Sequence, residues 1–185
     1  MDPDGQYVYY DIHDCAGFWR RAASLVVDLV AIALITIFFL WVLSTVGLVS
    51  MDVDPTPRTL ALLCVPAYVY LTVLKRSSVR TPGYWLTGLR IVDLKGRPPS
   101  MFTMSLRLAW WLLGPINPIL DFLYLSEDEQ RQTIRDKLMG TLVVKVAAHP
   151  AGHGAKTYDR AGFMGLMLTF PTVKRPRGAA SDQST

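Results

Sequence analysis

An unbroken uncharged stretch at residues 29–49 constrains this chain more than any other feature of its sequence. Between Arg21 and Asp52 the only charged residue is Asp28. At a rise of about 1.5 Å per residue, about 20 helical residues cross a hydrocarbon core of roughly 30 Å. The helices of soluble proteins interrupt such a run with polar residues at helical spacing. The stretch therefore predicts a membrane-spanning helix at about residues 22–49.

A second uncharged block occupies residues 59–74 and stops at Lys75 and Arg76. It contains Pro66 and is slightly short for a span, so we expect local thinning of the bilayer or a Lys75 side chain that reaches outward. We interpret it as a second transmembrane helix at about residues 59–75. Basic residues are frequent after this block and scarce before it, which predicts a cytoplasmic amino terminus and a cytoplasmic loop after the second helix.

A third apolar block, within residues 101–126, carries Pro115 and Pro118 near its centre. Prolines at this spacing break a helix, so the block is either one kinked span or two short half-helices. Two β-branched segments, residues 88–93 and 140–146, have strand composition and would each leave an unpaired edge alone. Their pairing needs both in one compartment, which favours a re-entrant hairpin or two tight spans.

These segments predict an all-α integral membrane protein with two clear transmembrane helices, a proline-broken third apolar segment and a small cytoplasmic β-hairpin-like element. We expect a cytoplasmic segment at residues 1–15, a membrane domain at 16–146 and a flexible cytoplasmic tail at 147–185. In that tail a short apolar patch, residues 163–170, would lie on the membrane surface. The acidic start lacks the features of a removable signal, so the first span is expected to direct insertion into the cell membrane as a multi-pass protein.

The charge pattern and the cysteines exclude several classes of function. The net charge is +4, but the basic residues cluster between and after the apolar blocks, which points to a membrane origin and not to a nucleic-acid partner. Cys15 and Cys64 fall at different predicted depths and do not have metal-ligand spacing. The sequence contains no phosphate-binding loop, nucleophile elbow or metal-binding helix motif. It therefore predicts no enzyme, no cofactor and no metal site.

Asp28 is the residue most suggestive of function. A carboxylate on an apolar helix costs several kcal/mol in hydrocarbon unless it is protonated, paired or hydrated. Arg21 lies seven residues earlier, on the same helical face, and is a candidate partner. Two interpretations remain open: an ion or proton site, or a buried polar pair that fixes helix packing near the cytoplasmic end.

Arg107, Asn117 and Asp121 are the other polar residues in apolar surroundings. Together with Asp28 they could line a polar path through a helical bundle. Arg107 is equally compatible with an interface anchor at a helix end, and Asn117 with a turn between two prolines. These residues are therefore secondary candidates.

Three ordered segments carry a resemblance to a known family: residues 19–28 (WRRAASLVVD), 80–93 (RTPGYWLTGLRIVD) and 131–144 (RQTIRDKLMGTLVV). Together they resemble the RDD family of bacterial membrane proteins. The resemblance implies a membrane domain over about residues 16–146. Some members of the family are described as sodium/proton antiporters, and others are domains attached to different proteins.

By that resemblance, the arginine and two aspartates after which the family is named would be Arg21 (or Arg20), Asp28 and Asp136. Two positions depart from the family pattern. Tyr84 stands where a lysine is usual, and Arg135 stands where histidine is common before the aspartate. A role that depends on that lysine or histidine is therefore not carried over to this chain.

Two functions compete at this stage. The first is a small cation/proton transporter, in which Asp28 alternately binds ion and proton and several copies assemble the pathway. The second is a non-catalytic membrane scaffold or assembly partner, in which Arg21, Asp28 and Asp136 hold a polar network. Both predict a lipid bilayer as the surroundings, and a second copy of the chain or another membrane protein as the partner.

Overall fold

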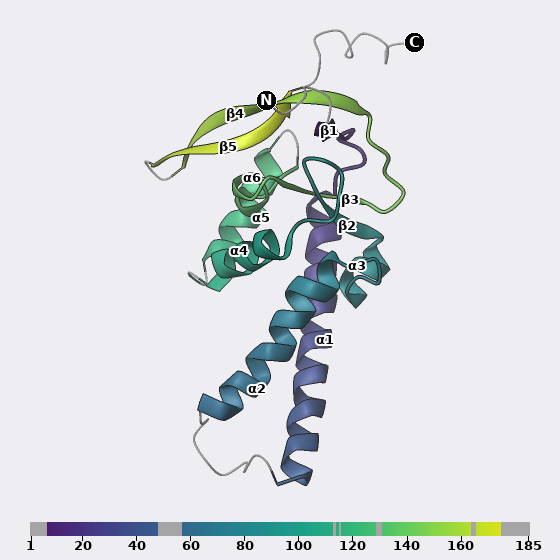
Figure 1. Cartoon of the computed structure of the whole chain (residues 1–185), viewed down its shortest axis with the longest axis vertical. Helices are drawn as coiled ribbons and strands as arrows, with labels where there is room; N and C mark the ends of the chain where they lie inside the picture. Colours follow the sequence, from purple (N-terminus) through teal and green to yellow (C-terminus); the bar gives the residue numbers. More distant parts are fainter. Residues whose placement is uncertain are drawn as a thin grey trace. The chain divides into compact units, whose positions relative to one another are not determined.

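The computed structural model describes residues 7–47, 57–112, 114, 116–128, 131–163 and 166–174. The chain forms two compact units. The helical unit is Trp19–Thr87, and the sheet unit joins Met1–Phe18 to Gly88–Thr185. Figure 1 labels their helices and strands.

The helical unit is built from α1 (Phe18–Thr45), α2 (Pro57–Tyr68), η1 (Val69–Leu74) and α3 (Pro82–Thr87). The second apolar block of the sequence forms α2 and η1, which follow each other directly. Pro66 lies inside α2 and cannot donate a backbone hydrogen bond there. The wider π-helical turn of η1 comes immediately after, as is common where a regular helix is disturbed.

Helix α1 has an inverted distribution of side chains. Its buried residues include Arg21, Ser24 and Asp28, which share one face. Large apolar side chains face outward, with Leu34 62% and Phe38 64% exposed. Only 6% of its most apolar window of 18 residues is buried. A core helix of a soluble protein buries its apolar stripe, so this pattern is typical of a helix surrounded by lipid.

The sheet unit contains five described strands: β1 (Tyr7–Tyr9), β2 (Leu89–Asp93), β3 (Thr141–Lys145), β4 (Gly152–Phe163) and β5 (Leu166–Lys174). They form two antiparallel sheets, one in the order β1-β4-β5 and one that pairs β2 with β3 (Figure 1). Both sheets contribute to an apolar core made of Val8, Tyr10, Cys15, Val92, Leu94, Leu142, Val144, Ala148 and Val173.

Three helices complete the sheet unit: α4 (Met101–Leu112), α5 (Asn117–Glu127) and α6 (Ile134–Leu138). The axes of α4 and α5 differ by 109° across the break between them. Pro118 lies at the start of α5, where the missing N–H is tolerated. Helix α6 begins with a capping box, in which Thr133 and Asp136 exchange side-chain to backbone hydrogen bonds.

The prediction of an all-α protein with several spans is wrong, because the described part of the chain contains five strands in two antiparallel sheets. Among the described residues, α1 is the one continuous helix long and apolar enough to cross a membrane. The predicted span at 59–75 is instead a shorter apolar helix, Leu63–Leu74, and the end of the predicted first span, residues 48–49, lies outside the described residues. The sequence predicted β2 and β3 but missed β1, β4 and β5, of which β4 is poor in apolar residues.

Within the tail predicted to be flexible, residues 147–185, the segments Gly152–Phe163 and Leu166–Lys174 form the paired strands β4 and β5. Its glycine- and alanine-rich composition suggested a flexible chain. The buried side chains of Phe170, Thr172 and Val173 attach this segment to the sheet unit. The apolar patch at 163–170 lies mostly in β5, and its predicted place on the membrane surface remains a prediction.

Two local predictions are confirmed. The segments at 88–93 and 140–146 pair as the antiparallel strands β2 and β3, from Leu89↔Lys145 to Asp93↔Thr141. The third apolar block is broken into two helices near its prolines. The membrane depth of those helices and the compartment of the paired strands remain predictions.

Candidate functional site

The Asp28 carboxylate is fully enclosed within the helical unit. It is 1% exposed and accepts hydrogen bonds from four groups. The Tyr70 hydroxyl and the Gly83 N–H donate to Oδ1, at 3.0 and 2.9 Å. The Lys75 ammonium and the Thr81 hydroxyl donate to Oδ2, at 3.0 and 3.1 Å. Both oxygens of the carboxylate are therefore engaged.

The loop before α3 places two of these donors. Arg80 has a φ of +65°, a left-handed conformation that is costly for a residue with a side chain. Its N–H donates to Ser77 Oγ at 3.2 Å, which stabilises the turn. The next residues, Thr81, Pro82 and Gly83, begin α3 with a side-chain hydroxyl and a free N–H directed at Asp28.

Gly83 is required by the close approach of α1 and α3. A Cβ at this position would lie 2.2 Å from the Ser24 carbonyl oxygen and 2.6 Å from Asp28 Oδ1. Both distances are far inside van der Waals contact. The absence of a side chain is what lets the Gly83 N–H reach the carboxylate.

Lys75 supplies the positive charge of this site. Its ammonium forms an ion pair with Asp28, and the side chain is 14% exposed. It also lies 4.5 Å from the centroid of the Tyr84 ring, a favourable cation–π distance. The expectation that Lys75 reaches outward along its helix is wrong, because the buried carboxylate attracts it instead.

A second buried ion pair lies in the sheet unit, between Arg107 of α4 and Asp136 of α6. Arg107 is 3% exposed and Asp136 is fully buried. The same guanidinium contacts the Thr141 hydroxyl at the start of β3. Gln132, also buried, donates from its side chain to the Thr141 carbonyl at 3.1 Å. This network joins α4, the α6 capping box and β3.

Asp121 organises the neighbouring part of the sheet unit. Its carboxylate is 1% exposed and accepts hydrogen bonds from Trp111 Nε1 and the Arg135 backbone N–H, both at 3.1 Å. The Arg135 guanidinium lies 3.4 Å from the same carboxylate and 4.4 Å from the Trp111 ring centroid. Asn117 donates to the Trp110 carbonyl at 2.7 Å, across the break between α4 and α5. Asp121 and Asn117 thus fix the angle between these helices.

Sequence comparison can now be set beside this geometry. The model of the RDD family matches residues 15–140, more than half of the chain. The chain belongs to the RDD family.

The RDD family is membrane-associated, in agreement with the exposed apolar surface of α1. The uncharacterized protein YckC of Bacillus subtilis (strain 168) is similar to this chain, with 23% identity over 146 residues. That alignment covers 72% of this chain and 86% of YckC. No solved structure matches the chain.

The structure separates the candidate residues of this RDD protein into groups. Arg107, Asp121 and Asp136 lie in one part of the sheet unit, and Asp28 belongs to the helical unit. Of the two arginines that could be the named one, Arg21 is buried and Arg20 is exposed. The proposed Arg21–Asp28 pair is replaced by the pair of Asp28 with Lys75.

Sequence reasoning missed four groups that surround Asp28: Tyr70, Lys75, Thr81 and Gly83. For Thr81 and Gly83 the sequence held a signal. The segment Thr-Pro-Gly is typical of a helix start, and the first N–H groups of a helix need acceptors. The tyrosine and lysine come from a segment far away in the sequence, and their approach to Asp28 depends on the fold of the unit.

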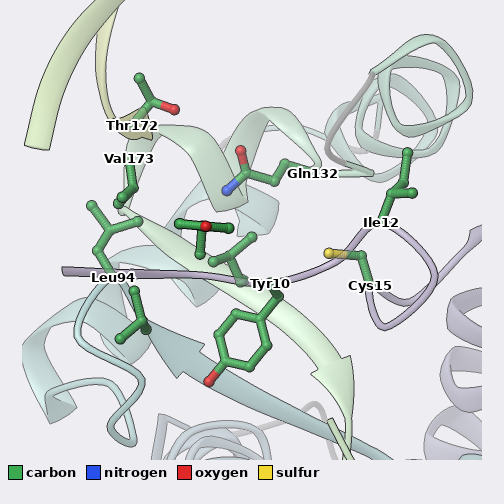
Figure 2. Close-up of a pocket in the computed structure, with 10 residues that line it drawn as sticks. Tyr10, Ile12, Cys15, Leu94, Gln132, Thr172 and Val173 are labelled. Carbon is green, nitrogen blue, oxygen red and sulfur yellow. The ribbon is translucent and has the colours of Figure 1, made fainter. Parts of the chain in front are cut away.

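One cavity in the core of the sheet unit has a volume of about 50 Å³ and is lined by residues that include Tyr10, Cys15, Gln132 and Thr172 (Figure 2). Burial raises the pKa of Tyr10. Small-molecule pockets are typically about 300–1,000 Å³, whereas roughly 10–15 Å³ suffices for a water. This cavity therefore suits a few water molecules.

The carboxylates of these networks are surrounded by hydrogen-bond donors. Among the described residues no group of three or more His, Cys, Asp or Glu side chains could hold a metal ion. Asp28 lies against a cation and three neutral donors, and Asp136 lies against a cation and the Thr133 backbone N–H. Such carboxylates are held in place as acceptors, which is a structural role in the first instance.

Proposed function

We propose that this RDD protein is a non-catalytic, membrane-anchored scaffold. In this proposal α1 holds the chain in the bilayer, the Asp28 network fixes the helical unit, and the Asp136 network fixes the sheet unit. The sheet unit then offers its surface to a second copy or to another membrane protein. The observation that carries the proposal is the full engagement of Asp28 by donors from its own chain.

A transported cation would have to displace these donors. The Lys75 ammonium already neutralises the carboxylate at 3.0 Å, and three uncharged donors complete its shell. Beside Tyr70 lies a cavity of about 20 Å³ whose lining is mostly apolar and includes Ile32 and Phe39. Apolar walls do not compensate an ion for its lost hydration. These features support a fixed polar network more than an ion path.

We also propose that the segment after η1 faces the cytoplasm. The support is the distribution of charge, since Lys75, Arg76 and Arg80 follow the second apolar block. Cytoplasmic loops carry an excess of Lys and Arg. Labelling of single cysteines in intact cells, with a reagent that does not cross the membrane, tests the orientation. Labelling of a cysteine in the segment after η1 before lysis would contradict it.

The decisive experiment measures ion flux in proteoliposomes that contain the purified full chain. We expect no Na⁺, K⁺ or H⁺ flux above that of empty vesicles for the wild type or for Asp28→Asn. The scaffold proposal further expects Asp28→Asn to lower the thermal unfolding midpoint in detergent. The matched control is Arg20→Gln, because Arg20 is exposed and should leave the midpoint unchanged. Wild-type flux that disappears in a correctly folded Asp28→Asn variant would overturn the proposal.

Cation/proton exchange is the second candidate, and one observation favours it. Among the described residues, the charged partner of the buried Asp28 carboxylate is a lysine, which a competing cation could replace. Exchange of this kind predicts that Lys75→Gln keeps cation binding but loses the coupling of cation to proton. The same vesicles, assayed under opposing Na⁺ and pH gradients, test this alternative.

A further inference from the structure

Helix α3 has two sides of opposite character. Gly83 and Tyr84 are buried in the helical unit. Trp85 and Leu86 lie on the other side and are each 64% exposed. They follow the exposed Pro82 by three and four residues, so these three side chains share one side of the helix. One side of α3 therefore packs into its unit, and the other presents large apolar side chains outward.

The outward side of α3 is unusually apolar for a short helix in a connecting segment. Val79, in the turn that precedes the helix, is 69% exposed and adds to the apolar surface of the same segment. Single exposed apolar side chains are common on proteins, but a group of large ones marks contact with a membrane or with another molecule. The level of α3 along α1 separates these two possibilities.

Helix α3 is fixed to one short section of α1. A Cβ on Gly83 would lie 2.2 Å from the Ser24 carbonyl oxygen, so the two backbones are in direct contact there. The Gly83 N–H and the Thr81 hydroxyl donate to Asp28, at 2.9 and 3.1 Å. The level of α3 on α1 is therefore that of residues 24–28, and Figure 1 shows α3 beside the amino-terminal part of the long helix.

This level lies at the end of the apolar part of α1. Helix α1 has 28 residues and is roughly 42 Å long at about 1.5 Å per residue, so it is longer than a hydrocarbon core of roughly 30 Å. Its charged residues, Arg20, Arg21 and Asp28, all lie in its first part, and the uncharged run begins at Leu29. When α1 crosses a bilayer, its first part therefore lies in the headgroup layer, and α3 lies beside it.

Two further observations favour lipid over a protein partner for the outward side of α3. At the same level of α1, Val26 is 60% exposed, and only 6% of the most apolar window of that helix is buried. Helix α3 thus adjoins a helix whose own apolar surface faces outward. Tryptophan is enriched in the headgroup layer, and Arg76 and Arg80, which precede α3, carry the charge that anionic headgroups attract.

We propose that α3 lies in the interfacial layer of the bilayer, with the Trp85 ring at headgroup level and Leu86 in contact with the acyl chains. Because α3 also holds Asp28 through Thr81 and Gly83, this position keeps the carboxylate at the membrane boundary and limits how deeply α1 can enter the core. The inference rests on the proposed place of α1 in the bilayer, and it adds the element that fixes the depth of that helix.

The experiment uses the full chain in lipid nanodiscs, with Cys64→Ala as the background because Cys64 is exposed and Cys15 is buried. A nitroxide spin label is attached at Leu86→Cys, at Leu34→Cys or at Arg20→Cys, all exposed positions of the helical unit. Paramagnetic resonance measures collisions of the label with oxygen, which concentrates in lipid, and with a nickel chelate, which stays in water. We expect oxygen to dominate at position 34, the nickel chelate to dominate at position 20, and position 86 to be intermediate.

A label at position 86 that collides with the nickel chelate as often as the label at position 20 would overturn the inference. A label there that is shielded from both reagents would overturn it in favour of a protein partner. Water exposure at position 34 would instead overturn the place of α1 itself, and the inference with it.

The role of the tryptophan is tested by Trp85→Ser in the protein labelled at position 86. Loss of the interfacial ring should shift the label toward the nickel chelate. The matched control is Trp41→Ser, which removes a tryptophan on α1 that is 59% exposed and should leave position 86 unchanged. An equal shift in the two variants would show that Trp85 does not anchor α3.

Discussion

Helix α1 of the helical unit and strands β2 and β3 of the sheet unit differ in the kind of side chain that they mainly bury. In the helical unit, α1 buries Arg21, Ser24 and Asp28, and its large apolar residues face outward. In the sheet unit, β2 and β3 bury apolar residues such as Leu89 and Val144, both 0% exposed. One chain is therefore organised for two solvents. Water drives apolar residues into a core, whereas lipid removes that drive and leaves polar groups with the stronger need for burial.

Both units nevertheless use the same device, a buried carboxylate paired with a cation. Asp28 pairs with Lys75, and Asp136 pairs with Arg107. The pairs differ in how they are assembled. Asp136 is also held by the capping box of its own helix, which is local in sequence, whereas the hydrogen-bond donors to Asp28 all come from beyond its own helix. The Asp28 network should therefore depend more strongly on the tertiary fold.

The largest expected effect is that of Lys75→Met, which removes the cation and leaves the Asp28 carboxylate buried and unpaired. Breaking a buried ion pair from one side costs about 3–5 kcal/mol. We expect a large fall in the thermal unfolding midpoint in detergent, or loss of the folded protein. Circular dichroism of the purified full chain measures the change.

The neighbouring Arg76→Met is the control for Lys75→Met, because it removes a cation one residue away that does not contact Asp28. It should change the midpoint little. The double variant Lys75→Met with Asp28→Leu removes both charges and should recover most of the loss. Equal losses in Lys75→Met and Arg76→Met would show that the Asp28 pair does not hold the helical unit together.

Gly83→Ala should have the next largest effect. The new Cβ would lie 2.2 Å from the Ser24 carbonyl oxygen, so α3 must move away from α1 and its N–H must leave Asp28. Overpacking of this kind costs about 1–3 kcal/mol, and a backbone neighbour places it near the upper end. The control is Gly114→Ala, since a Cβ there meets nothing within 4 Å. If both variants have the same thermal unfolding midpoint as the wild type, the close approach of α1 and α3 is wrong.

A pair of truncations sharpens the contrast between the two solvents. Val144→Ala removes part of a fully buried side chain in the sheet-unit core and should cost about 2 kcal/mol. Leu34→Ala removes more atoms from a side chain that is 62% exposed on α1, and it should cost less than about 0.5 kcal/mol in detergent. Thermal unfolding of the two variants under identical conditions makes the comparison. The reverse order would place Leu34 in a packed core and Val144 outside one.

The smallest expected effect is a decline in stability at high pH, caused by the Lys137–Asp128 pair of the sheet unit. Burial by itself lowers the pKa of Lys137, but its hydrogen bond to Asp128 and the charge of that carboxylate outweigh burial and raise the pKa above its ordinary value. A raised pKa means that the pair contributes fully below the unfolded-state value, near 10.5, and loses its contribution as the pH rises through the higher folded-state value.

Unfolding midpoints measured from pH 8 to 12 test this linkage in the wild type and in Lys137→Met. The wild type should lose on the order of 1 kcal/mol or less from this pair across the alkaline range. The variant should be less stable at pH 8 and should decline less steeply. An identical slope of unfolding midpoint against pH in both proteins would show that Lys137 does not contribute to the decline in stability.

The candidate sites were partly predictable. Asp28 stood out because a carboxylate in an apolar helix has to be compensated, and Arg107 and Asp121 stood out for the same reason. The partners were harder to predict. Arg21 was the candidate partner of Asp28 by helical spacing, but Tyr70, Lys75 and Gly83 occupy the carboxylate. The turn at Arg80 explains the position of Gly83 alone. Spacing within one helix says nothing about the groups that other helices supply.

The sequence by itself determined the apolar helix α1, the break between α4 and α5, the pairing of β2 with β3 and membership of the RDD family. These follow from local composition, from the chemistry of proline and from ordered motifs. Only the tertiary structure decided that β4 and β5 are paired strands and that Asp28 pairs with Lys75. Strand pairing and ion pairing join segments far apart in the chain, and the free energy that selects such partners comes from burial and hydrogen bonding across the fold.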